Sequence, residues 1–169
     1  MAGLQWIESM QVSSALLGAL VAVMNPEVYN TGVRCIQAFN DDPDMVAKSG
    51  QLQELLEVWS SPYPVVSLIS NQDSPLHRDN GGDYSSMDLL ASVGDYVNGR
   101  FNVPGLGPDL LYSSGTVIGV ASWVVHHRAT ARGQQLCLAM WLQQNVLASS
   151  NIPAPDWVQI QDLEMLCSK

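Results

Sequence analysis

Positive charge is scarce in this chain. Its 169 residues include 7 Lys and Arg against 16 Asp and Glu, which gives a formal net charge of −9 at pH 7. A protein that holds duplex DNA mainly by neutralising phosphates needs a surplus of basic side chains. The composition therefore argues against that mode of binding and counts against a nucleic acid as substrate, although Arg128 and Arg132 are close enough in sequence to form a local basic patch.

Cysteine is equally sparse. The three cysteines, Cys35, Cys137 and Cys167, are widely spaced, and none belongs to a C-x-x-C pair. An odd number of cysteines without that spacing argues against a disulfide framework and against a zinc ribbon. We therefore expect free or buried thiols in a reducing compartment, nuclear or cytoplasmic.

Long hydrophobic runs are missing as well. The longest, residues 15–24, is interrupted by Gly18 and ends at Asn25-Pro26. A helix that spans a bilayer needs about 20 apolar residues, and no basic stretch precedes this run as it would in a secretory signal. Because 47% of the residues are hydrophobic, we expect one globular domain with one core and no membrane segment. Nothing in the pattern predicts an oligomeric state.

The texture of the chain changes near residue 60. Before that point, apolar residues at helical spacing predict helices over residues 5–24, 26–39 and 44–59. After it, short β-rich runs punctuated by Gly, Asn, Asp, Ser and Pro predict strands over residues 65–69, 86–93, 99–103, 110–112, 116–127 and 135–142. The expected fold is a single α+β domain, with helical support at 1–60, a β core at 61–148 and a tail at 149–169 that holds a short helix near 156–167.

The three histidines of the chain lie in two small clusters. His77 belongs to the segment His77-Arg78-Asp79, and His126 and His127 close the predicted strand 116–127. A histidine and an aspartate at i and i+2 on an extended segment point to the same face. With a later histidine from a neighbouring strand they form two imidazoles and one carboxylate, the facial triad of non-haem iron(II) oxygenases, which leaves coordination positions open.

An H-x-D pattern alone is a weak signal, because a surface turn can carry the same residues. Here it follows a predicted strand, precedes the Gly-rich segment 80–82, and is followed 48 residues after Asp79 by His127, with no histidine placed elsewhere. These features favour a metal site. Neighbouring strand residues face opposite sides, so only one of His126 and His127 is expected to reach the metal.

Several segments match a known family in order and spacing. The segments are 59–63 (WSSPY), 67–71 (SLISN), 74–79 (SPLHRD), 84–96 (YSSMDLLASVGDY), 104–107 (PGLG), 111–117 (LYSSGTV), 125–127 (VHH) and 133–141 (GQQLCLAMW). Together they resemble the TET/JBP family of nucleic-acid oxygenases, in the form that occurs in basidiomycete fungi. The resemblance covers nearly the whole chain and is clearest over residues 59–146.

The resemblance implies a double-stranded β-helix, or jelly roll, that carries an iron(II)- and 2-oxoglutarate-dependent dioxygenase. Such enzymes oxidise a methyl group on a base of DNA or RNA, of the 5-methylcytosine or N6-methyladenine type, after the base has been flipped out of the stack. The implied metal ligands are His77, Asp79 and His127. The spacing from the turn at 115–116 and the following segment 128–130 both favour His127 over His126.

One position departs from the family pattern. These enzymes place an arginine after the distal histidine, where it clamps a 2-oxoglutarate carboxylate, and that position holds Gln135. Either Arg128 or Arg132 substitutes from a shifted register, or co-substrate binding is weak, or the protein is an inactive paralogue. Asn71 is expected either to donate to the co-substrate or base, or to form an Asx-turn.

Further pocket residues are expected among the polar and aromatic side chains of the β region. Asp88 and Tyr112 could line the pocket. Trp123 and Trp141 could stack on a base, although aromatic residues on strands more often belong to the core.

Three functions compete on this reading. The first is an enzyme that oxidises methylated bases. The second is an oxygenase of the same fold that acts on a small molecule, which the acidic charge favours. The third is a catalytically degenerate binding protein, which Gln135 favours.

Overall fold

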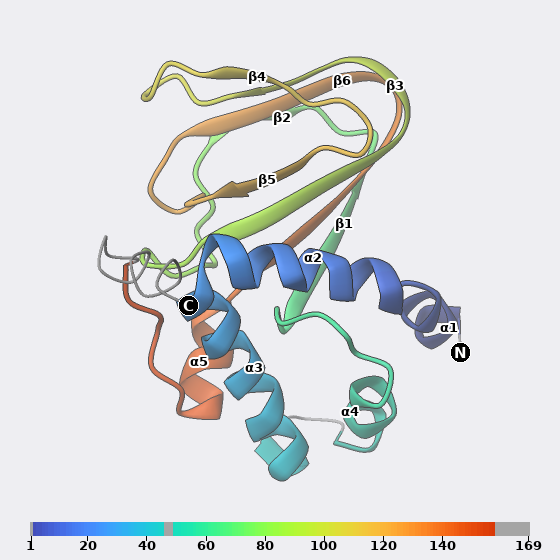
Figure 1. Ribbon diagram of the computed structural model, residues 1–169, viewed down its shortest axis with the longest axis vertical. Helices are drawn as coiled ribbons and strands as arrows, with labels where there is room; N and C mark the ends of the chain where they lie inside the picture. The colour runs from blue at the N-terminus through green and yellow to red at the C-terminus, as the bar shows by residue number, and fades with distance from the viewer. Residues whose placement is uncertain (1, 46–48, 158–169) are drawn as a thin grey trace. The chain divides into compact units, whose positions relative to one another are not determined.

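The computed structural model describes residues 2–45 and 49–157 (Figure 1). They fall into two compact units. One unit contains Met1–Tyr63 and Asn145–Lys169, and its described elements are helices; the other is Pro64–Gln144 and contains the strands. The α+β prediction is confirmed.

The helical unit begins with a broken helix. The predicted helix 5–24 is two helices, α1 (Ala2–Ser9) and α2 (Gln11–Met24), which meet at a bend of 60°. Two serine side chains donate hydrogen bonds to backbone carbonyls on either side of Met10. Ser9 Oγ donates to the Trp6 carbonyl, and Ser60 Oγ donates to the Gln11 carbonyl. Serine bonds of this kind compete with the helical ladder. By length and composition no single described helix could cross a membrane, although α1 and α2 meet the criterion as a bent pair.

The next helix agrees with the sequence prediction. Helix α3 (Pro26–Asp41) starts at Asn25, whose side chain accepts a hydrogen bond from the Val28 amide, and Pro26 occupies its first position. Both features are favoured helix-start chemistry. The predicted helix 44–59 is instead a 3-10 turn, η1 (Pro43–Met45), and the short α4 (Ser49–Leu56).

The last part of the chain differs from the prediction. Helix α5 (Gln144–Ser150) occupies residues that were expected to belong to the β core. The helix expected near 156–167 lies almost entirely outside the described residues.

The β unit is an antiparallel sheet whose path runs β1-β6-β3-β4, with β2 paired to β6 and β5 paired to β3. Its strands are β1 (Val65–Ser70), β2 (Ser74–His77), β3 (Asp88–Asn102), β4 (Asp109–Leu111), β5 (Val117–Val120) and β6 (His127–Trp141). The two long strands β3 and β6 pair along most of their length and form the middle of the sheet (Figure 1).

Two strand boundaries were predicted wrongly. The strands expected at 86–93 and 99–103 are one strand. Its pairing with β6 continues past Asn98 and Gly99, with a register shift between Val97 and Arg100 and Asn98 at φ 56°. The run expected at 116–127 ends at Val120, and residues 121–126 turn back so that His127 begins β6 rather than closing the strand before it.

Glycine allows β3 and β6 to stay paired through their curved middle. Gly94 and Gly133 have φ of +133° and +126°, a region that favours glycine. A Cβ at Gly133 would lie 2.5 Å from the Asp95 carbonyl oxygen, and one at Gly94 would collide with the Gln134 carbonyl. Strand β6 therefore continues without interruption from His127 to Gln135 and beyond.

The core of the β unit is mainly apolar. The buried members are Leu90, Phe101, Val103, Tyr112, Val120 and Ala139, and the partly buried Ile118, Val125, Ala129, Cys137 and Trp141 pack against them. This cluster lies beside the residues of the candidate site.

Candidate functional site

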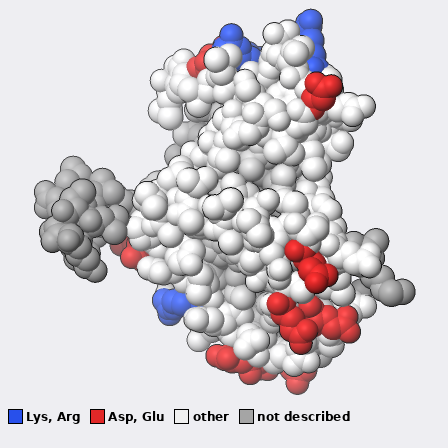
Figure 2. Space-filling view, turned by 45° about the vertical axis from the view of Figure 1, so that its right-hand side comes forward, with Lys and Arg blue, Asp and Glu red and all other residues white. Residues whose placement is uncertain are grey.

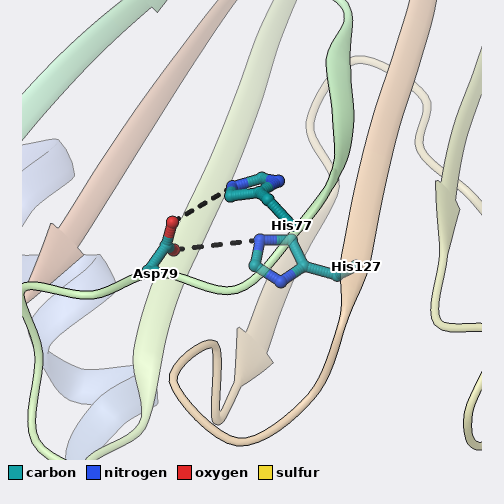
Figure 3. A group of neighbouring side chains, drawn as sticks. All are labelled: His77, Asp79 and His127. Carbon is teal, nitrogen blue, oxygen red and sulfur yellow. Dashed lines mark ion pairs between the residues drawn. The ribbon is translucent and has the colours of Figure 1, made fainter.

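The three residues proposed as metal ligands converge in the β unit. Their ligand atoms, from His77, Asp79 and His127, all lie within 4.8 Å of one another (Figure 3). His77 is the last residue of β2, Asp79 follows in the adjoining loop, and His127 is the first residue of β6. The antiparallel pairing of β2 with β6 makes His77 and His127 direct Cα partners, which places their side chains side by side.

The geometry of the rings suits a shared ion. The His77 and His127 ring centroids are 4.5 Å apart. Their Nε2 atoms both face Asp79, at 3.1 Å from Oδ1 for His77 and 3.8 Å from Oδ2 for His127. The Asp79 backbone amide donates to the Ser122 carbonyl at 3.1 Å, which fixes the loop that carries the carboxylate.

The second nitrogen of each ring is held by a carbonyl. His77 Nδ1 lies 2.7 Å from the Pro75 carbonyl oxygen, and His127 Nδ1 lies 3.2 Å from that of Val125. A carbonyl oxygen can only accept, so both contacts are hydrogen bonds in the tautomer that carries its proton on Nδ1, and that tautomer leaves an Nε2 lone pair for a metal. Metal-ligating histidines usually have this arrangement.

His127 is in the protonation state that a metal requires. It is buried, and Phe101 stacks on its ring at a centroid distance of 5.4 Å. Burial lowers the pKa of His127 and so favours the neutral imidazole. His126 and Arg78 are exposed and are not members of the three-residue group.

A model of the Tet_JBP family, the oxygenase domain of the 2OGFeDO superfamily, matches residues 4–144. The chain belongs to this family. No curated protein matches it. Membership in the 2OGFeDO superfamily, whose oxygenases depend on 2-oxoglutarate and iron(II), implies both groups as cofactors of the Tet_JBP domain.

The residues present fit the iron. Two imidazoles and one carboxylate, with ligand atoms that all lie within 4.8 Å of one another, are the donor set of non-haem iron(II) oxygenases. Asp79 is partly exposed, so one side of the group remains open.

The residues present do not fit the usual anchor for 2-oxoglutarate in this family. Gln135 is buried, and its side-chain amide donates to Ser92 Oγ at 2.8 Å. Ser92 Oγ in turn lies 2.7 Å from Tyr96 Oη. Asn71 pairs with the Gln135 backbone. Its side-chain Oδ1 accepts from the Gln135 backbone amide at 2.7 Å, and its backbone amide donates to the Gln135 backbone carbonyl at 2.9 Å. The network is neutral, and it engages the side-chain nitrogen and both backbone polar groups of Gln135.

No buried cation compensates for Gln135. Residues 64–144, all of which the structure describes, contain no lysine, and their arginines, Arg78, Arg100, Arg128 and Arg132, are all exposed. Tyr112 and Cys137 lie nearby in the core, with Tyr112 Oη 3.3 Å from Cys137 Sγ, and burial raises the pKa of both groups, which keeps them neutral.

On the face drawn in Figure 2, acidic side chains form patches whereas basic ones are isolated.

A cavity of about 280 Å³ adjoins the metal group. Asp79 belongs to both, so an ion held by the group would border this cavity. Strands β1, β3 and β6 and the loop after β2 supply the wall, which consists of Ser67, Ile69, Asp79, Asn80, Gly81, Gly82, Asp88, Leu90, Ala139 and Trp141. No basic residue is among them. Of the two residues expected to line the pocket, Asp88 lines the cavity and Tyr112 does not. Trp141 also lines it, although a core position was favoured for Trp123 and Trp141, and Trp141 packs against the core cluster as well.

Asp88 is the buried carboxyl group of this cavity. Its side chain is 7% exposed, and burial raises its pKa to about 7, against the opposing effect of a hydrogen bond from Ser122. Ser122 Oγ donates to Asp88 Oδ2. Sequence reasoning missed Ser122, which contacts the candidate metal ligand Asp79 through its carbonyl and Asp88 through its hydroxyl. A single serine in a turn carries no sequence signal for that role.

Proposed function

We propose that this chain is an iron(II)- and 2-oxoglutarate-dependent dioxygenase that oxidises the methyl group of a nucleic-acid base, of the 5-methylcytosine or N6-methyladenine type. The observation that carries the proposal is the convergence of His77, Asp79 and His127 at the edge of a cavity walled by an indole and a carboxyl group. Family membership supports the oxygenase chemistry. The antiparallel pairing of the strands agrees with a double-stranded β-helix.

Each part of the site has a task in this proposal. His77, Asp79 and His127 would hold the iron, and the bound iron would supply oxidising chemistry at a methyl C–H bond. Trp141 offers a flat apolar surface on which a base can stack, and Leu90 and Ile69 add apolar walls that exclude water. A cavity of about 280 Å³ admits one base rather than a base pair, so the base enters flipped out of its strand.

A second candidate function is a degenerate family member that binds a modified base without turnover. The buried Gln135, engaged with Ser92 where a cation is expected, favours this alternative. The net charge of −9 and the cavity without basic residues would also suit a small-molecule substrate.

The proposal is tested by adding iron(II), 2-oxoglutarate and oxygen to the protein with single-stranded oligonucleotides that carry 5-methylcytosine, N6-methyladenine or the unmethylated bases. Mass spectrometry of the digested bases, together with succinate release, reports the reaction. We expect oxidised base only from the methylated oligonucleotides, and no oxidised base from any oligonucleotide when the Asp79→Ala variant replaces the wild type. Binding of the methylated base without any oxidation would support the degenerate alternative, and succinate release without base oxidation would indicate a different substrate.

A further inference from the structure

Asp88 stands out because the metal group does not include it and the fold does not neutralise it. It is the first residue of β3, it is 7% exposed, and it lines the cavity next to Asp79. A buried carboxyl group without a cation is costly and is normally satisfied by hydrogen bonds. In the β unit every arginine side chain is exposed, so no buried cation of this unit pairs with Asp88.

Only part of the Asp88 carboxyl is used within the described residues. Ser122 Oγ donates to Oδ2, and none of the groups described there donates to Oδ1. The neighbouring Gly82 leaves space beside the carboxyl, because an ideal Cβ on Gly82 would lie 3.8 Å from Oδ1 and 4.0 Å from Oδ2. Any larger side chain at Gly82 would fill that space. The cavity therefore presents a free acceptor oxygen to its contents.

The rest of the cavity wall also favours a ligand edge that donates hydrogen bonds over one that accepts them. Asp79 and Asp88 are its ionisable groups, and the other lining residues are neutral. A ligand edge that carries carbonyl oxygens or negative charge would face unfavourable electrostatics there, whereas an N–H edge would pair with Oδ1. Cytosine and adenine carry an exocyclic amino group on their major-groove edge, where thymine and guanine present a carbonyl oxygen.

We infer that Asp88 is a specificity-determining residue that accepts a hydrogen bond from the exocyclic amino group of the substrate base. This inference rests on the proposed function. It assigns 5-methylcytosine or N6-methyladenine as the substrate class and excludes thymine, although thymine also carries a methyl group. A site that is built to bond a polar group discriminates strongly against an analogue that lacks it, because the buried partner is then left unpaired.

The experiment measures equilibrium binding to the manganese(II)-loaded protein, which avoids turnover. The probes are fluorescein-labelled single-stranded oligonucleotides of deoxyuridine with one central 5-methylcytosine, N6-methyladenine or thymine, read by fluorescence anisotropy at about pH 8, where a carboxyl with a raised pKa is ionised. Deoxyuridine carries neither an amino nor a methyl group, so the central base alone provides them. We expect the wild type to prefer an amino-bearing base over thymine by about tenfold or more.

Asp88→Asn should abolish this preference. With the Ser122 hydroxyl on the amide oxygen, the new amide NH2 faces the cavity and donates to the thymine carbonyl. The ratio of the affinity for an amino-bearing base to the affinity for thymine should therefore fall by about tenfold or more. The matched control is Asp83→Asn. Asp83 is also a buried carboxyl, but it accepts hydrogen bonds from Ser85 and does not line the cavity. The affinity ratio of Asp83→Asn should match that of the wild type. Circular dichroism checks that each variant is folded.

The outcomes separate this inference from the proposed function. An unchanged ratio in folded Asp88→Asn overturns the role of Asp88 and leaves the proposed function standing. A wild type that binds thymine as tightly as 5-methylcytosine and N6-methyladenine overturns the inference without any variant. If none of the oligonucleotides binds, the proposed function fails first and the inference fails with it.

Discussion

Two buried residues of β6, His127 and Gln135, differ in what they contact. At the start of the strand, the ligand atoms of His127, His77 and Asp79 all lie within 4.8 Å of one another. Farther along, the side-chain nitrogen of Gln135 donates to Ser92 Oγ and its backbone amide donates to Asn71 Oδ1. One end of this part of β6 is arranged for a ligand, whereas the other is bonded within the chain.

This difference shows that two tasks of the fold are separable. Holding a metal needs a local cluster of lone pairs, which the pairing of β2 with β6 provides. Anchoring a dicarboxylate needs a cation in the interior, because an unpaired buried carboxylate is costly by several kcal/mol. The chain carries the first arrangement without the second, and the predictions below test each end separately.

The largest effect is expected at the metal end. Replacing Asp79 by alanine should lower the affinity for iron(II) or manganese(II) by at least about 100-fold, since loss of an outer-shell partner alone costs up to that amount. Isothermal titration calorimetry with manganese(II) measures the change. Asp95→Ala, which removes an exposed carboxylate on β3, is the control. Undiminished binding in Asp79→Ala would mean that the three residues are not the metal site.

The paired histidines should separate in the same assay. His127→Ala is expected to abolish measurable manganese binding, because it removes a buried ligand whose ring is already held by Phe101 and the Val125 carbonyl. His126→Ala should leave the affinity within about threefold of wild type, as expected for an exposed residue outside the site. The reverse result would place His126 at the metal and shift the strand register by one residue.

The sequence was most informative where the chemistry is local. The pair His77 and Asp79 could be proposed from its i, i+2 spacing together with the strand before it and the Gly-rich segment after it. The position of His127 at the start of β6 could not, because residues 121–126 contain Trp and Val and read as a continuation of the preceding strand, whereas in the structure they turn. The link from Ser122 to Asp88 depends on tertiary contact between residues 34 positions apart, which no local pattern encodes.

The fold shows the same limit. Helix α3 follows from Asn25 and Pro26, which are local start signals. The continuity of β3 through Asn98 depends on its partner β6, which keeps pairing on both sides of the register shift. The turn residues at that point predicted a break, and tertiary pairing outweighed them.

A moderate effect is expected at Gln135. The metal-loaded wild type should bind 2-oxoglutarate weakly, and Gln135→Arg should bind it about fivefold more tightly, because a charge-assisted hydrogen bond contributes about 1 kcal/mol more than a neutral one. Calorimetric titration of 2-oxoglutarate measures both, and Gln134→Arg on the exposed neighbouring residue controls for net charge. Tight binding by the wild type that is lost in Arg128→Ala or Arg132→Ala would show that a neighbouring arginine acts as the clamp.

The smallest effect is expected at Asn71, where β1 ends. Its φ of 51° favours Gly or Asn, and its Oδ1 accepts from the Gln135 amide at 2.7 Å. Asn71→Gly keeps the backbone conformation but removes the acceptor, so the free energy of unfolding should fall by about 1 kcal/mol with manganese affinity unchanged. Asn71→Asp keeps the acceptor and should retain most of the stability. Chemical denaturation measures both variants. If Asn71→Gly instead leaves the stability unchanged and weakens 2-oxoglutarate binding, Asn71 donates to the co-substrate, and the Gln135 end of β6 binds a ligand after all.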